Sequence, residues 1–165
     1  MIRHEIVATI PGDPQPKGSL KCVGKRGKRG HVLVEDNPQA GPWRVELVRV
    51  LRKTVQRGDK GQPITVEITS TLHRPASHYG TGRNLDRVKP SAPAYPTGHG
   101  TGDADKLARL VLDALEDVGI LVNDAQVIDV TSRKTYAVDP LSDPINNVPD
   151  ALPYPGVVIR VTPYR

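Results

Sequence analysis

The chain has 165 residues, enough for one domain with a real core, and the absence of Phe leaves Val, Leu, Ile and Ala to fill that core. A net charge of +5 fits a nucleic-acid partner and a merely solvated basic surface equally well. The single cysteine excludes an internal disulfide. Because neither a signal peptide nor a membrane-span pattern is found, we expect a cytoplasmic protein without a membrane partner.

The first predicted elements are a strand over residues 5–10, ended by Pro11-Gly12, and a basic loop over residues 17–31 that can also be drawn as a hairpin. Five cations fall within nine residues of that loop. An exposed linker is the simpler interpretation, and a phosphate-contacting arm is the functional one. The candidate DNA-binding residues of the loop are Lys21, Lys25, Arg26, Lys28 and Arg29.

A helix is predicted over residues 41–57, with Pro42 in its first turn. Its apolar face is Trp43, Leu47, Val50 and Leu51, and its basic residues project elsewhere. A charged outer side is the favoured interpretation, and a DNA-facing side is the alternative. A half-buried strand then follows from Ile64, because apolar and polar residues alternate there.

Residues 74–102 form an insert rich in Pro, Gly and His, with no periodic pattern. An insert of this length is usually functional or disordered. His73, His78 and His99 match no closed zinc motif, so we interpret them as loop histidines.

The clearest helix follows Asp103 and ends at Gly119, and two more strands are predicted, from Val127 and from Gly156. Leucine, valine and alanine line one face of this helix at helical spacing. The order strand, helix, strand, helix, strand, strand predicts an α+β fold. We expect a single compact domain, residues 1–165, with a mixed β-sheet and two main helices packed on it.

Carboxylates stand at both ends of this helix, with Asp103 and Asp105 at its start and Asp124 beyond its end. Capping accounts for one of the first two, and a turn accounts for Asp124 alone. If residues 120–124 ran back extended, they would span roughly 17 Å and return Asp124 to the helix start. Three converging carboxylates require a cation, and oxygen ligands suit Mg²⁺ or Mn²⁺. We therefore predict that Asp103, Asp105 and Asp124 form a catalytic metal site.

Two cations near this site are candidates for contact with the scissile phosphate. Arg109 lies one turn after Asp105, and Lys134 lies on the strand after Asp124. The simpler interpretation of Arg109 is a salt bridge to Asp105 four residues earlier.

The segments DADKLARLVLDAL and GILVNDAQVIDVTSRKTYA resemble the RusA family of Holliday junction resolvases. The resemblance matches Asp103, Asp105 and Asp124 to the family's metal-site acids and Lys134 to its strand lysine, and PGDPQPKGS adds Lys17 as a DNA-binding candidate. Lys106 stands where the family has Asn, and Arg109 where it has Lys. Because Arg has the charge but not the geometry of Lys, Lys106 is a further DNA-binding candidate.

The resemblance implies a RusA-like homodimer that resolves four-way DNA junctions by paired phosphodiester hydrolysis with Mg²⁺ or Mn²⁺, in DNA recombination and repair. It also implies a bacterial cell as the setting, with a phage or prophage origin. Two alternatives stay open from the residues themselves. One is a non-catalytic basic DNA-binding module, and the other is a metal-dependent nuclease acting on flaps or duplex DNA.

Overall fold

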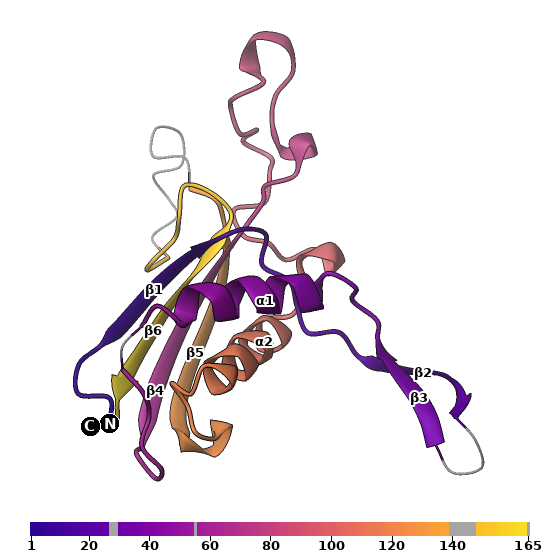
Figure 1. Ribbon diagram of the computed structural model, residues 1–165. Coiled ribbons are helices and arrows are strands. Elements are labelled where there is room, and N and C mark those ends of the chain that lie inside the picture. Colours follow the sequence, from indigo (N-terminus) through magenta and orange to yellow (C-terminus); the bar gives the residue numbers. More distant parts are fainter. Residues whose placement is uncertain (27–29, 55, 139–147, 165) are drawn as a thin grey trace.

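A mixed four-stranded sheet in the order β1-β6-β4-β5 forms the centre of the molecule (Figure 1). The computed structural model describes residues 1–26, 30–54, 56–138 and 148–164. Strands β4 and β5 are parallel, and the β1–β6 and β4–β6 pairs are antiparallel. The elements in chain order are β1 (Ile6–Pro11), β2 (Leu20–Arg26), β3 (Gly30–Glu35), α1 (Ala40–Leu51), β4 (Ile64–Leu72), α2 (Ala104–Asp117), β5 (Val127–Tyr136) and β6 (Gly156–Pro163).

Both α-helices cover the same side of this sheet (Figure 1). The predicted α+β architecture, with a mixed sheet and two main helices, is confirmed. No helix in the described part of the chain is long and apolar enough to cross a bilayer.

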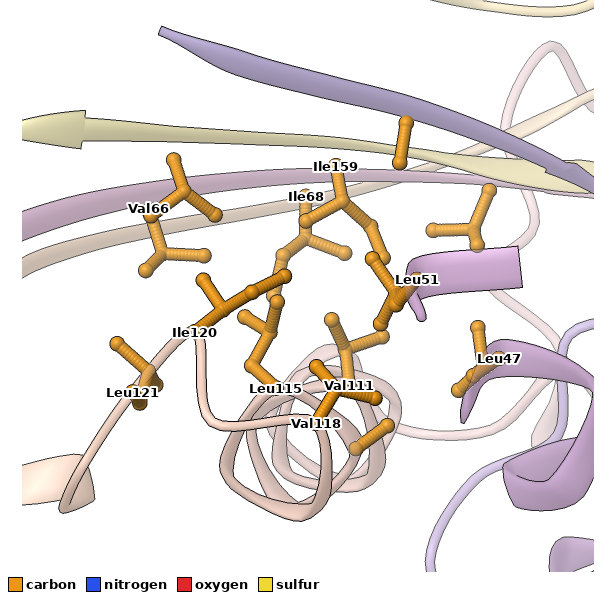
Figure 2. Packing of buried hydrophobic residues seen from close by; sticks show 14 of the residues in the cluster. Leu47, Leu51, Val66, Ile68, Val111, Leu115, Val118, Ile120, Leu121 and Ile159 are labelled. Atoms are coloured by element: carbon orange, nitrogen blue, oxygen red, sulfur yellow. The ribbon is translucent and has the colours of Figure 1, made fainter. Parts of the chain in front are cut away.

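The core lies between the helices and the sheet, and aliphatic side chains fill it (Figure 2). The predicted apolar face of α2 is buried throughout, as is most of the predicted face of α1. Leu115 of α2 is fully buried in the same apolar cluster as Leu51 of α1 and Ile68 of β4 (Figure 2). The absence of Phe is therefore met by close packing of branched aliphatic groups.

Replacing Leu115 by Ala is expected to lower the free energy of unfolding by about 2–5 kcal/mol, because it removes buried methyl groups and leaves a cavity. Urea unfolding followed by circular dichroism measures this change. Val45→Ala is the control, because Val45 is 68% exposed on α1 and its truncation should cost less than about 0.5 kcal/mol. Equal effects from the two substitutions would contradict the packing described here.

Of the two forms predicted for the basic loop, the hairpin is confirmed, and the antiparallel pair β2–β3 projects from the body (Figure 1). Two predicted boundaries were wrong. The first helix ends at Leu51, not at residue 57, because the Thr54 hydroxyl and the Thr54 backbone N–H both donate to the Leu51 carbonyl and close a tight turn. The first strand begins and ends one residue later than predicted.

The predicted structureless insert also has internal order. It contains three short 3₁₀ helices, at residues 76–78, 82–84 and 99–101. Residues 76–98, which we call the insert arm, project away from the sheet (Figure 1). The insert therefore supplies a second projection besides the β2–β3 hairpin.

Candidate active site

Two carboxylates face solvent at the start of α2. Asp103 occupies the N-cap position, but its side chain accepts no capping hydrogen bond and is 67% exposed. Its carboxylate pairs with Lys106 Nζ at 3.2 Å. Asp105 is exposed in the first turn and forms no hydrogen bond or ion pair within the described ranges. Neither aspartate side chain caps the helix, so the simpler interpretation of these residues is not supported.

Asp124 lies at the opposite end of α2. The Ile120 and Leu121 backbone N–H groups both donate to the Leu115 carbonyl, so the chain folds tightly at the helix end instead of running back along it. The Asp124 N–H then donates to Glu116 Oε1 at 2.5 Å. Glu116 is eleven residues beyond Asp105, which is roughly 17 Å along a helix axis.

The prediction that Asp103, Asp105 and Asp124 meet within one chain is therefore wrong. A capping box fixes the position of Asp124, with the Asn123 side chain accepting from the Ala125 N–H. Across the described residues, no three His, Cys, Asp or Glu side chains are grouped as metal ligands. Any site that uses all three aspartates must draw on more than one copy of the chain.

The C-terminal half of β5, and not its start, lies next to the beginning of α2. Lys134 Nζ donates to the Gly102 carbonyl at 2.7 Å and to Thr101 Oγ1 at 3.1 Å. Ser132 Oγ donates to the Ala104 carbonyl at 2.8 Å. These bonds hold the Lys134 ammonium directly before the two exposed aspartates.

Lys17 is tied to α2, which differs from its predicted role. Its ammonium donates to Asp113 Oδ2 at 2.5 Å, and its backbone N–H donates to the Lys106 carbonyl at 3.0 Å. One turn further along α2, Asp117 accepts two hydrogen bonds from Arg44 of α1, and this carboxylate raises the pKa of the Arg44 guanidinium. In this conformation Lys17 joins the turn before β2 to α2. Its amine is bound to Asp113 and does not face a phosphate site.

A hollow of about 300 Å³ connects the Lys17 turn with the start of α2. Asp36, His99, Asp103 and Lys106 are among its lining residues. The Ser19 N–H donates to the Asp36 carboxylate at 2.7 Å, and this bond, aided by Lys21, lowers the pKa of Asp36. No periodic pattern or motif in the sequence indicates Asp36, and the spacing of His99 fits no zinc site.

The other predicted DNA-binding residues have different outcomes. Lys21 is 68% exposed on the hairpin, 3.3 Å from Asp36 Oδ2. Lys25 and Arg26 lie in β2, where the structure defines the backbone alone, and Lys28 and Arg29 fall outside the described residues. Arg109 is exposed, and its predicted salt bridge to Asp105 is not observed.

Two basic residues of α1 are paired with carboxylates, whereas Arg52, Lys53 and Arg57 beyond its end are exposed and form no ion pair with a described residue. Arg49 binds the Glu46 carboxylate, which raises the pKa of Arg49, and Arg44 is held by Asp117 as described above. For Arg44 and Arg49, a charged outer surface is therefore better supported than the DNA-facing alternative.

The fold and the site define a basic α+β protein that presents carboxylates and ammonium groups together at one helix start, a combination suited to phosphodiester chemistry. The model of the family described as Endodeoxyribonuclease RusA matches residues 11–141. The chain therefore belongs to the RusA family of Holliday junction-resolving endonucleases. No curated protein matches it.

Proposed function

We propose that this protein is a divalent-metal-dependent endonuclease that resolves four-way DNA junctions by paired phosphodiester hydrolysis, in DNA recombination and repair. One observation carries the proposal beyond family membership. Asp103 and Asp105 are exposed at the start of α2 with no capping role, beside the ammonium groups of Lys106 and Lys134. Asp103 forms a surface ion pair with Lys106, and Asp105 has no partner among the described residues, so both exposed carboxylates are available to ligands.

The residues fit Mg²⁺ or Mn²⁺. Both are hard ions that take oxygen ligands, and Mg²⁺ is commonly held by one or two carboxylates together with phosphate oxygens. Asp103 and Asp105 supply those carboxylates. When bound, the ion supplies Lewis-acid stabilisation of the phosphodiester and a more acidic water. Lys134 and Arg109 add positive charge where the phosphate gains negative charge.

A second copy of the chain can supply the third carboxylate. Strand β5 is at one edge of the sheet, and none of the described strands pairs with its outer side. Ile128 and Val130 are 58% and 48% exposed along β5. A long edge with exposed apolar side chains favours pairing with another strand.

Antiparallel pairing of two β5 strands about a two-fold axis places the start of each beside the end of the other. The start of β5 follows Asp124, and its end carries Lys134, which lies next to Asp103. The same operation sets the two α2 helices antiparallel on one side of the joined sheet. We therefore propose a homodimer in which Asp124 of one copy joins Asp103 and Asp105 of the other.

Cleavage of a synthetic four-way junction tests the proposed function. Labelled junction, flap and linear duplex are incubated with the protein at moderate salt, in Mg²⁺, in Mn²⁺ and in EDTA. We expect paired nicks in the junction with either metal, slower cutting of flap and duplex, and no product in EDTA. The products are resolved on denaturing gels.

The same assay separates the alternatives. Junction binding without product in any metal would favour a DNA-binding module. Equal cutting of flap, duplex and junction would favour a nuclease of broader specificity. Full activity in EDTA would contradict the metal dependence.

A further inference from the structure

The insert arm is fixed to the strand that carries the site lysine. Arg74, at its root, is 3% exposed, its guanidinium lies 4.6 Å from the centre of the Tyr136 ring, and its Nη1 donates to the Pro93 carbonyl. His78 meets the same ring edge-on at 5.4 Å. Tyr136 follows Lys134 by two residues on β5. The arm therefore has a defined position relative to the candidate active site.

Backbone hydrogen bonds give the arm a hairpin form up to its tip. Tyr79 and Val88 form an antiparallel bridge, the Gly80 N–H donates to the Arg87 carbonyl, and the Lys89 N–H donates to the His78 carbonyl. A Cβ on Gly80 would lie 2.6 Å from the Asn84 carbonyl oxygen, so only glycine permits this close approach. The tip, residues 81–87, is thus a turn held by a paired stem.

The tip combines an apolar side chain with two cations. Leu85 is 68% exposed, and Arg83 and Arg87 are exposed on either side of it. Neither arginine forms an ion pair with a described residue, Asp86 included. A single exposed leucine is ordinary on a protein surface. A leucine between two free arginines, at the end of an arm anchored to the site strand, has the composition of a wedge that enters DNA.

We propose that the tip of the insert arm binds the branched DNA, with Arg83 and Arg87 on phosphates and Leu85 inserted at the branch point. This inference rests on the proposed function, because it takes branched DNA as the ligand of the neighbouring site. A base pair at the branch point is fully stacked on one of its two faces only. Inserting an apolar side chain against the other face therefore costs less unstacking free energy than it would inside a duplex. The arm would thereby contribute to recognition of the branch.

The test uses a four-way junction with 2-aminopurine at the branch point, which becomes brighter when it is unstacked. Binding is measured in EDTA, so that no cutting occurs. Wild-type protein should raise the fluorescence severalfold. Leu85→Ala should lose most of that rise while its affinity falls by less than about tenfold. Val45→Ala, which truncates a side chain of the same 68% exposure on α1, should behave as wild type.

The arginines are tested through salt dependence. Replacing both Arg83 and Arg87 by Ala should weaken binding and reduce the slope of log affinity against log salt by about two. An unchanged slope together with an unchanged Leu85→Ala fluorescence signal would overturn the proposed role of the arm. If the tip instead docks on a protein partner, these variants will bind and unstack the junction like wild type.

The two proposals fail separately. Wild-type protein that cuts junctions in Mg²⁺ but never brightens the probe would remove the wedge and leave the nuclease. Protein that binds and brightens the probe but cuts in no metal would remove the nuclease and leave the wedge.

Discussion

Asp105→Asn is expected to abolish junction cleavage while junction binding stays intact or becomes tighter. Asp105 is exposed in the first turn of α2 and has no partner among the described residues, so its replacement breaks no contact of the fold. Loss of partners behind metal ligands already costs about 10–100-fold, so loss of a direct ligand should cost at least about 100-fold in rate. Removing a negative charge beside phosphates favours DNA binding. Single-turnover cleavage and a binding titration on the same junction measure both effects.

Glu5→Gln is the matched control. It makes the same carboxylate-to-amide change on an exposed side chain just before β1, at the sheet edge opposite β5, and its partner Arg160 keeps two hydrogen bonds to Asp150. It should cut at the wild-type rate, and any tightening of binding seen with it reports charge alone. Cleavage by Asp105→Asn at a rate near that of wild type would show that this carboxylate is not part of the active site.

The parts of the fold that could be predicted from the sequence are those set by local periodicity. The apolar residues of α2 recur at helical spacing, and those of the predicted face are buried as that spacing requires: Leu107, Leu110, Val111, Ala114, Leu115 and Val118. The alternation from Ile64 likewise marks β4, with Ile64, Val66 and Ile68 fully buried. In these segments one periodic pattern decides both the element and its buried face.

The sequence left a loop and a hairpin both open for the basic segment, and it did not determine the position of Asp124. The β2–β3 segment is rich in Gly and Lys, so it lacks the alternation that marks a strand. For Asp124, chain length allowed a return to the helix start, and the two backbone bonds to the Leu115 carbonyl prevented it. Sequence distance limits where a residue can go, whereas a turn at a helix end decides where it does go.

The separation of Asp124 from Asp105 also changes what the family motif means for this chain. A motif in one sequence suggests one site in one chain. In this chain, however, Asp103 and Asp105 lie at the start of α2 and Asp124 lies beyond its end. The proposed two-fold partner would reconcile the motif with the geometry, because two antiparallel helices bring unlike ends together. Two such sites on one dimer suit two nicks on symmetric strands.

Mixing two inactive variants is the sharpest test of this arrangement. Asp105→Asn and Asp124→Asn should each be inactive alone. When the two are refolded together in equal amounts, about half of the dimers are mixed, and each mixed dimer has one intact site and one doubly altered site. We expect nicking at about a quarter of the wild-type rate, with single nicks replacing paired ones. Counting nicked and fully resolved junctions on native and denaturing gels distinguishes the two products.

A double variant gives the opposite signature and serves as the control. Mixed equally with wild type, Asp105→Asn/Asp124→Asn should reduce activity to about a quarter if the sites are shared between copies, because every mixed dimer then lacks an intact site. If each chain carried its own complete site, the same mixture would keep about half the activity, and the two single variants would stay inactive together. That pair of results would contradict the shared site, because Asp124 would then act within its own chain.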